Sequence, residues 1–366
     1  MTSDIKSTQS QRPRIAVVGV GALGRHHAAK LSAMDNVELV AVADTNQTQG
    51  EKVAADNDCE WVADYTELFG RIDAVSVAVP TVAHLAVASE FLKRKIAVFV
   101  EKPIASSVAE ARQLVSCARK NDCLIQVGHI ERFNPATQVA WQHSGPPKYI
   151  KADRVSPYTF RSTDIGVVHD LMIHDIDLIL DLVRSPVRNV WAFGVSIAGG
   201  HEDTVQARLS FENGCVADLT ASRMSPSAHR KMQIWSQSGC VNVDFTTRDV
   251  TSFEPSEAMV YGKPLCERAA EPGSDIEQLK SRVFGHFIRL EKPPVTDVDA
   301  LEAELASFVE CVTTDTLPVV GGTEALAAME VAEQILDSVA AHQWDGVENG
   351  IVGPFARPAD RQRRAG

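Results

Sequence analysis

The chain has 366 residues, of which 45% are hydrophobic and 23% are charged, and its formal net charge is -12. Its length favours two domains over one, and its composition is that of an ordinary globular protein. The acidic balance argues against nucleic acid or an anionic membrane surface as a partner, although a local basic pocket could still hold a small anion.

The seven cysteines are scattered and form no CxxC pair, which argues against a disulfide framework or a zinc site and favours a reducing compartment. The first residues are polar and are not those of a signal peptide. No apolar run reaches the roughly 18 residues that a membrane span needs. We therefore expect a cytoplasmic protein with a disordered lead over residues 1–12, no membrane partner and no metal site.

From residue 14 the sequence alternates short apolar runs with helical stretches. Continuous Val, Ile and Ala strands between helices predict a parallel sheet covered on both faces, so residues 13–130 are expected to form a doubly wound α/β domain. Expected strands cover 14–21, 37–44, 73–80, 96–103 and 123–129, and expected helices cover 22–34, 46–57, 84–95 and 107–120.

The rhythm changes near residue 130, where strands begin to follow one another with little helix between them. This predicts an α+β domain over 131–345, built on an open-faced, mostly antiparallel sheet and followed by a mobile tail at 346–366. Expected strands cover 148–155, 187–199, 204–214, 215–224, 231–239 and 240–247. Expected helices cover 165–184, 298–314 and 322–340, of which the last could pack back on the first domain.

A glycine motif follows the first expected strand and opens the first helix. In this GxGxxG string Gly19 permits a tight turn, Gly21 lets the backbone approach a pyrophosphate, and Gly24 lets helix and strand pack closely. Asp44 ends the second strand 20 residues after Gly24, where an acid accepts hydrogen bonds from ribose hydroxyls and repels a 2′-phosphate. We therefore expect NAD rather than NADP. The loop residues expected to contact it are Gly19, Gly21, Ala22, Leu23 and Gly24.

The helix at 165–184 carries a polar stripe on an otherwise apolar surface. Its members recur at spacings of 4, 3 and 4 and so share one face of an α-helix: Asp170, His174, Asp177 and Asp181. A helix that is apolar around most of its circumference is buried, so the stripe needs partners or a cavity. The alternative is a stripe that faces water, with Asp177 and Asp181 as ordinary surface residues.

Glu101-Lys102-Pro103, together with the glycine motif and Ala78-Val79-Pro80-Thr81, resembles the glucose–fructose oxidoreductase/inositol dehydrogenase (Gfo/Idh/MocA) family. The resemblance covers about residues 13–345. It implies an NAD-dependent oxidoreductase with a Rossmann domain and a sheet domain for substrate contact and homo-oligomerisation, as a dimer or tetramer. Beside the glycine loop and Asp44, the implied cofactor contacts are Val79, Pro80, Thr81, His84, Glu101 and Lys102.

The resemblance places Lys102 and His174 at the site of hydride transfer, with Asp170 nearby. Oxidising a secondary alcohol needs a base that takes the hydroxyl proton, and imidazole titrates near neutral pH. Asp170 could orient the imidazole, and Lys102 could steady the developing alkoxide. Lysine as the base is the open alternative, because the cationic nicotinamide ring disfavours a second positive charge nearby. His26 and His27 need no special role.

The string GHIERFNP at 128–135 is similar to the branch of the family that acts on UDP-N-acetylated sugars. That branch implies oxidation of a sugar to its 3-keto derivative ahead of transamination, as in lipid A type synthesis. A basic, aromatic stretch at 148–161 could hold the diphosphate and stack the uracil, or it could be the solvated face of an edge strand. The expected substrate contacts are His129, Arg132, Tyr158 and Arg161. An inositol or polyol dehydrogenase and a non-catalytic NAD(H) sensor are the competing functions.

Overall fold

The computed structural model describes residues 12–160, 165–348 and 350–354, and these fold into two units. Unit 1 comprises 12–130 and 299–326, and unit 2 comprises the described residues of 131–298 and 327–354. The predicted lead, except Arg12, and the last residues of the predicted tail lie outside the described residues. Within the described ranges, every helix is too short or too polar to cross a lipid bilayer.

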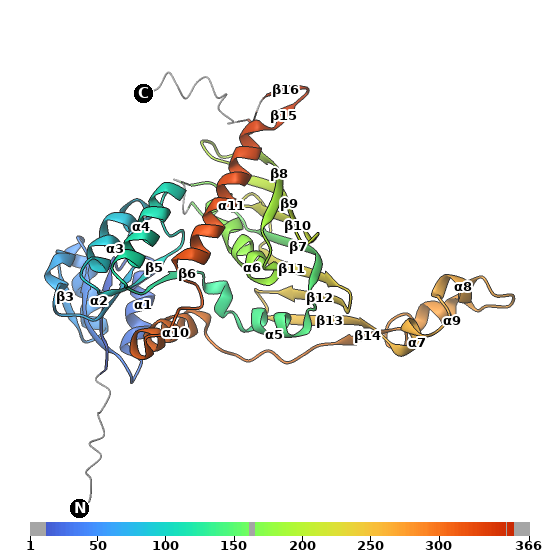
Figure 1. Ribbon diagram of the computed structural model, residues 1–366, viewed down its shortest axis with the longest axis horizontal. Coiled ribbons are helices and arrows are strands. Elements are labelled where there is room, and N and C mark those ends of the chain that lie inside the picture. The colour runs from blue at the N-terminus through green and yellow to red at the C-terminus, as the bar shows by residue number, and fades with distance from the viewer. Residues whose placement is uncertain (1–11, 161–164, 349, 355–366) are drawn as a thin grey trace, which may run out of the picture. The chain divides into compact units, whose positions relative to one another are not determined.

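Unit 1 is a six-stranded parallel sheet with the strand order β3-β2-β1-β4-β5-β6, which is the doubly wound order. Helix α3 packs against α4, and α1 packs against α2 and α10 (Figure 1). The strands are β1 (Arg14–Val18), β2 (Glu38–Ala43), β3 (Glu60–Val62), β4 (Ala74–Val77), β5 (Ala97–Glu101) and β6 (Ile125–Gly128). The helices are α1 (Gly24–Ser32), α2 (Gln47–Asp56), η1 (Tyr65–Leu68), η2 (Thr81–Ala83), α3 (His84–Leu92), α4 (Val108–Lys120) and α10 (Ala300–Thr314).

Helix α10 returns the chain to unit 1, which corrects its assignment to the second domain. Leu305 and Phe308 belong to the same buried core as Ile15 and Phe99. The rings of Phe99 and Phe308 lie edge to face with centroids 5.8 Å apart. The apolar face of a helix does not reveal in the sequence which sheet it will cover, so this return could not be predicted. Helix α11 (Gly322–Ala341) begins in unit 1 and continues in unit 2.

Unit 2 is built on an eight-stranded sheet with the order β14-β13-β12-β11-β7-β10-β9-β8. Only β7 and β10 pair in parallel among its described strands. The strands are β7 (Pro147–Val155), β8 (Val187–Val195), β9 (Thr204–Phe211), β10 (Val216–Ser222), β11 (His229–Ser236), β12 (Gly239–Asp244), β13 (Asp249–Pro255) and β14 (Ile288–Glu291). The helices are η3 (Ile130–Phe133), α5 (Pro135–His143), η4 (Val168–Met172), α6 (Ile173–Val183), α7 (Glu257–Val260), α8 (Leu265–Ala269) and α9 (Ile276–Ser281).

One face of this sheet is packed and the other is open. Helix α6 packs on β7, η4 on β10 and α5 on β12, and the strand residues beneath them, such as Ile150 and Ile234, are buried. On the opposite face the neighbours Tyr149 and Trp235 pair across β7 and β11, and Trp235 is exposed. The predicted fold class, a Rossmann domain followed by an open-faced and mostly antiparallel sheet, is confirmed.

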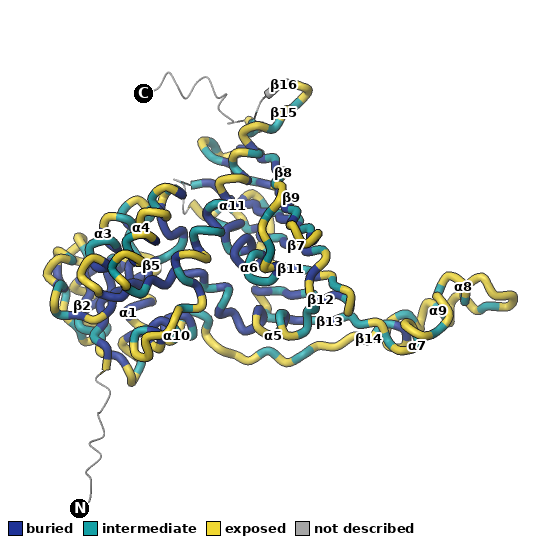
Figure 2. Tube along the Cα trace, in the orientation of Figure 1, coloured by how far each residue is buried: buried dark blue, intermediate teal, exposed yellow. Residues whose placement is uncertain are grey.

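Several segments of unit 2 differ from the sequence prediction, among them helix α5 and strands β13 and β14, which were not expected. Between β13 and β14 the helices α7, α8 and α9, which were not predicted, project from the sheet edge and contain no buried residue (Figures 1 and 2). The predicted tail begins too early, because β15 (Gln343–Trp344) and β16 (Val347–Glu348) pair as a hairpin. Beyond them the backbone N–H of Ser196 donates to the carbonyl oxygen of Val352 (2.7 Å).

Candidate active site

The glycine loop lies at the carboxyl end of β1 and has the shape that a dinucleotide requires. Gly19 has a φ of +84°, and a Cβ on Gly24 would lie 1.8 Å from the carbonyl oxygen of Gly19, so both positions need glycine. A Cβ on Gly21 would meet no described atom within 4 Å, so the backbone there borders open space. That space, in front of the N-terminus of α1, fits the pyrophosphate of a dinucleotide.

Asp44 follows β2, the neighbouring strand, and holds the glycine loop. Its Oδ2 accepts a hydrogen bond from the backbone N–H of Val20 (2.8 Å), and its Oδ1 accepts one from Asn46 (2.8 Å). Each carboxylate oxygen has a further lone pair that can accept from a ribose hydroxyl. The ribose contact was predicted from the sequence. The structure adds that the same carboxylate holds the glycine loop through the backbone N–H of Val20.

His84 connects the loops that follow β4 and β5. The ring is buried, with Nε2 3.0 Å from the carbonyl oxygen of Val79 and Nδ1 3.0 Å from that of Pro103. Burial lowers the pKa of His84, because the imidazolium would lose its water. His84 therefore holds together the loops that carry the predicted contacts Val79, Pro80, Thr81 and Lys102 of the cofactor edge.

Glu101 ends β5 and lies against a histidine that the sequence analysis left without a role. Nε2 of His27 lies 3.0 Å from Oε1 of Glu101, and Nδ1 of His27 lies 2.8 Å from Oγ of Ser76. The backbone N–H of Lys102 donates to Oε2 of the same carboxylate (3.2 Å). The only sequence signal for this contact was the position of His27, three residues after Gly24 on α1.

The helix that carries the predicted base is not α-helical throughout. Residues Val168–Met172 form a π turn, η4, and α6 begins at Ile173. Asp170 lies in the π turn and His174 in the first α-helical turn, and both are half-buried. The expected α-helix over 165–184 therefore begins with a π turn, and the common face of Asp170 and His174 stays a prediction. Such π turns occur often at functional sites.

The start of this helix is held by Glu202. The backbone N–H of Val168 donates to Oε1 of Glu202 (3.2 Å), and that of Val167 donates to its carbonyl oxygen (3.1 Å). A Cβ on Gly166 would lie 1.9 Å from Oε1 of Glu202, so a larger residue before the helix would have to displace this carboxylate. Burial raises the pKa of Glu202, because the carboxylate lies among residues that exclude water.

Tyr158, a predicted substrate contact, lies beside the same helix start. Its ring packs edge to face with Phe160 (centroids 5.0 Å apart), and Phe160 is 84% exposed. The guanidinium of Arg223 lies 5.3 Å from the centre of the Tyr158 ring and donates to Asp203 (2.6 Å) and to the carbonyl oxygen of Ile165 (2.8 Å). Arg161, the other predicted contact in this stretch, lies outside the described residues.

Arg132, predicted to bind substrate, packs against α6. Its Nε donates to Oδ2 of Asp177 (2.7 Å) and its Nη1 lies 2.9 Å from Oδ1 of Asp181. Asp181 also accepts a hydrogen bond from Nε1 of Trp141 (2.9 Å). Asp177 and Asp181 are therefore partners of Arg132 and not ordinary surface residues. The geometry gives Arg132 a structural role, and its role as a substrate contact stays a prediction.

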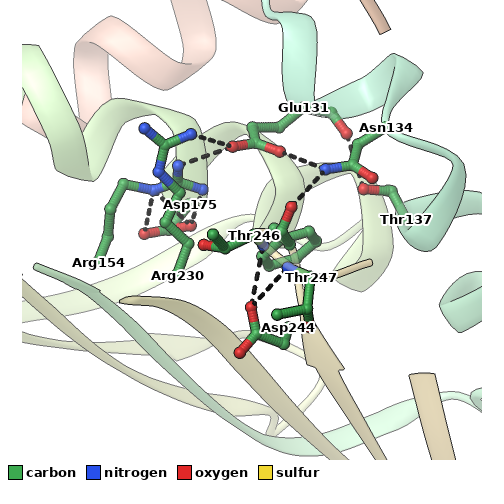
Figure 3. Close-up of polar contacts among 10 residues, drawn as sticks. Glu131, Asn134, Thr137, Arg154, Asp175, Arg230, Asp244, Thr246 and Thr247 are labelled. Carbon is green, nitrogen blue, oxygen red and sulfur yellow. Dashed lines mark hydrogen bonds and ion pairs between the residues drawn. The ribbon is translucent and has the colours of Figure 1, made fainter. Parts of the chain in front are cut away.

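The rest of the GHIERFNP string forms a buried polar cluster (Figure 3). Arg154 is bidentate to Asp175 (3.0 and 2.8 Å) and donates to Oε1 of Glu131 (2.8 Å), while Asn134 donates to Oε2 of Glu131 (3.0 Å). Burial would raise the pKa of Glu131, but Arg154 and Asn134 outweigh it and hold that pKa below its usual range. At Asp175 burial prevails and raises the pKa. Neither Asp175 nor this cluster was predicted from the sequence.

Within its described residues, 148–160, the basic, aromatic stretch does not form one patch. Strand β7 lies in the middle of its sheet, so the edge-strand alternative was wrong. Along it Arg154 turns to the buried side, while Lys151 pairs with Asp153 (3.0 Å) and the Tyr149 hydroxyl donates to Asp218 (2.9 Å) on the open side.

His129, the remaining predicted substrate contact, is buried directly after β6 in unit 1. Its backbone N–H donates to the carbonyl oxygen of Val127 (2.8 Å). Lys102 also belongs to unit 1, whereas Asp170 and His174 belong to unit 2. Among the described residues, no three His, Cys, Asp or Glu side chains are grouped so that they could hold a metal ion.

Comparison with known proteins identifies the family. Residues 13–129 match the model of an oxidoreductase family with an NAD-binding Rossmann fold, and residues 128–242 match the GFO/IDH/MocA C-terminal domain. The chain belongs to the Gfo/Idh/MocA family. It is an NAD-dependent oxidoreductase that acts on CH–OH groups, and the resemblance seen in the sequence is confirmed.

Several Gfo/Idh/MocA proteins are similar to this chain over most of their length. UDP-N-acetylglucosamine 3-dehydrogenase of Acidithiobacillus ferrooxidans is 36% identical over 252 residues, which are 69% of this chain and 80% of the relative. The scyllo-inositol 2-dehydrogenase (NAD(+)) of Bacillus subtilis is 29% identical over 235 residues, 59% of this chain and 69% of the relative. A solved structure of the Acidithiobacillus enzyme superposes with a TM-score of 0.78 at 31% identity and covers 89% of this chain and 97% of its own.

Proposed function

We propose that this dehydrogenase oxidises a ring hydroxyl of a sugar nucleotide, with UDP-N-acetylglucosamine as the substrate and its 3-keto derivative as the product. The observation that carries the proposal is the similarity to the Acidithiobacillus UDP-N-acetylglucosamine 3-dehydrogenase, in sequence and in fold. The GHIERFNP string supports it less directly, because its polar side chains build the interior of unit 2.

Unit 1 would hold the cofactor. The open backbone at Gly21 and the N-terminus of α1 would receive the pyrophosphate, and Asp44 would accept from the adenosine ribose hydroxyls. NAD, when bound, supplies the acceptor for the hydride that leaves the substrate carbon. The negative charge of Asp44 would also repel the 2′-phosphate of NADP.

The proton chemistry is assigned to His174 and Lys102. We propose that the imidazole of His174 takes the hydroxyl proton while the hydride leaves the same carbon, so that the secondary alcohol becomes a ketone. Lys102 would stabilise the oxygen as its negative charge develops, and Asp170 would orient the imidazole. The reverse assignment, with Lys102 as the base, differs only in which nitrogen receives the proton.

The nucleotide end of the substrate would meet Tyr158 and Phe160. Phe160 is exposed, and the Arg223 guanidinium beneath Tyr158 fixes that ring, so the pair offers an aromatic surface on which uracil can stack. Arg161 would bind the diphosphate, and His129 would line the pocket for the sugar. A 3-keto sugar is a reactive carbonyl compound, so we propose an aminotransferase, as in lipid A type synthesis, as the enzyme that consumes it.

We also propose a cytoplasmic homo-oligomer, a dimer or a tetramer, that assembles through the open face of the unit 2 sheet. Trp191 and Trp235 are exposed there, and large apolar side chains in water favour association. All seven cysteines are free thiols, as expected in a reducing cytoplasm. Light scattering should give a dimer or tetramer for the wild type and a smaller species for Trp235→Glu. A monomeric wild type would contradict the assembly.

The substrate proposal is tested by binding to the NADH complex. NADH fluorescence should be quenched in a saturable way by UDP-N-acetylglucosamine and by its product analogues, and not by myo-inositol or scyllo-inositol. UDP and N-acetylglucosamine alone should each bind more weakly than the intact sugar nucleotide, because each makes only part of the contacts. Quenching by the inositols with none by the UDP-sugars would replace the proposal with a polyol dehydrogenase.

A further inference from the structure

His27 joins three elements of unit 1 beneath the cofactor edge. It is 1% exposed and extends from α1, the helix that follows the glycine loop. Its ring lies between Ser76 on β4 and Glu101 on β5, and it packs edge to face on Phe99 with centroids 5.5 Å apart. A buried histidine with a defined partner at each ring nitrogen can adopt only one orientation.

The bond to Glu101 has a defined direction. An ionised carboxylate can only accept hydrogen bonds, so Nε2 of His27 carries the proton that lies between them. Ser76 can donate to Nδ1 when the ring is neutral and accept from it when the ring is charged. The contact to Glu101 therefore persists in both protonation states of His27.

Glu101 in turn shapes the turn that bears Lys102. Its Oε2 accepts the backbone N–H of Lys102 (3.2 Å), so the carboxylate fixes the first peptide after β5. A Cβ on Gly128, at the end of the adjacent strand β6, would lie 3.0 Å from Oε2 of Glu101. Glycine at that position leaves room for the carboxylate, which is clamped between β6, α1 and its own strand.

The charged and titratable groups that face Glu101 are His27 from α1, Lys102 from the turn after β5 and His84 from α3. Burial would raise the pKa of Glu101, but the hydrogen bond and charge of His27, with the charge of Lys102, hold that pKa below its usual range. His27 makes the strongest of the favourable contributions. Without His27, burial would have the larger effect and the carboxyl group would protonate at a higher pH.

We propose that His27 is a positioning residue for hydride transfer: it holds the Glu101 carboxylate and, through Glu101, the orientation of Lys102 at the cofactor edge. The inference rests on the proposed role of Lys102, but it does not depend on which alcohol is oxidised. The contacts that carry it lie within unit 1.

Two substitutions separate the two contacts of the ring. Gln places its amide nitrogen near the position of Nε2 and keeps a donor for Glu101, whereas Asn places its amide near Nδ1 and loses that contact. The His27→Asn variant should lose about ten- to a hundredfold in kcat, as expected for one charged hydrogen bond, while the NADH Kd from fluorescence stays unchanged. His27→Gln should recover most of that loss. His26→Asn on the exposed neighbour is the matched control and should behave as the wild type.

If His27 had only a structural role, its replacement would leave the pH dependence of kcat unchanged. The pH profile of kcat therefore tests the positioning role. In His27→Asn the acid limb should shift to higher pH by about one unit, because Glu101 must remain ionised and now binds its proton more readily. Glu101→Gln should slow the enzyme to a similar extent, and the His27→Asn/Glu101→Gln double variant should be no slower than the slower single variant.

Equal kcat values and equal pH profiles for His27→Asn and His27→Gln would overturn the proposal. Wild-type activity in Glu101→Gln would also overturn it, even if His27→Asn fails to fold. The assays use whichever alcohol the wild type oxidises in the UDP-sugar and polyol panel. A different substrate would therefore refute the proposed function and leave this test intact.

Discussion

The Nε atom of Arg132 lies 2.7 Å from Oδ2 of Asp177, and both side chains are almost fully buried. A second nitrogen of the same guanidinium lies 2.9 Å from Asp181, one turn further along α6. An arginine held in this way by two carboxylates is a structural connection between η3 and the helix that carries His174. Its surroundings are those of an interior ion pair.

Arg132→Met should therefore reduce stability more than substrate affinity. The substitution breaks the buried ion pair between Arg132 and Asp177, and breaking such a pair costs about 3–5 kcal/mol in the free energy of unfolding. Urea denaturation measures the loss. Arg161→Ala is the contrasting variant: it should raise the KM for the UDP-sugar by roughly ten- to a hundredfold and alter kcat less. A stable Arg132→Met protein with a strongly raised KM would return Arg132 to the substrate site.

Cofactor choice should depend on Asp44. Thr45 is the exposed residue next to Asp44. The double variant Asp44→Ser/Thr45→Arg should bind NAD more weakly and should have a higher ratio of NADP turnover to NAD turnover. Because Asp44 also accepts from Val20, the single Asp44→Ser variant should already raise the KM for NAD. Steady-state kinetics with both cofactors give the ratio. Efficient use of NADP by the wild type would contradict this role of the carboxylate.

Substitutions at Lys102 and His174 should reduce turnover and leave cofactor binding unchanged. Lys102→Ala and His174→Ala should each bind NADH as the wild type does, since the glycine loop and Asp44 make the phosphate and ribose contacts. Each should lose about a hundred- to ten-thousandfold in kcat, the range expected for general acid–base assistance. Near-wild-type turnover in the His174 variant would leave Lys102 as the base.

Stability at alkaline pH should improve when Glu202 loses its charge. Its folded-state pKa is raised, so its contribution to stability is full below the ordinary glutamate pKa and is lost as the pH rises through the raised one. Glutamine can still accept from the N–H of Val168 without a buried charge. Glu202→Gln should therefore match or exceed the wild-type Tm at pH 8 and lose that advantage at pH 5. A lower Tm at pH 8 would show that the charge itself caps the helix.

The parts of this protein that the sequence predicted are those that depend on local pattern. Strand–helix alternation and the glycine motif predicted the doubly wound unit, because continuous apolar strands fit only a sheet covered on both faces. For a related reason, the sequence alone predicted that the residues of the cofactor edge lie close together. Parallel strands end at the same edge of a sheet, so Gly19, Asp44 and Lys102 had to approach one another.

The parts that escaped prediction depend on tertiary partners. Asp175 differs from Asp177 by only two positions, and nothing in the sequence says that one meets Arg154 and the other Arg132. The π turn at 168–172 changes the hydrogen bonding without changing the apolar pattern. No special role was predicted from the sequence for His27, whose ring lies between Ser76 and Glu101 in the structure.

The most direct test of the substrate assignment is oxidation itself. The enzyme is incubated with NAD⁺ and UDP-N-acetylglucosamine, with myo-inositol in a parallel reaction, and an aminotransferase with its amino donor is added to remove the ketone. We expect NADH formation and a 3-amino sugar nucleotide with UDP-N-acetylglucosamine, both slowed about a hundred- to ten-thousandfold in His174→Ala. If no NADH or amino sugar appears while myo-inositol is oxidised readily, the sugar-nucleotide assignment is contradicted.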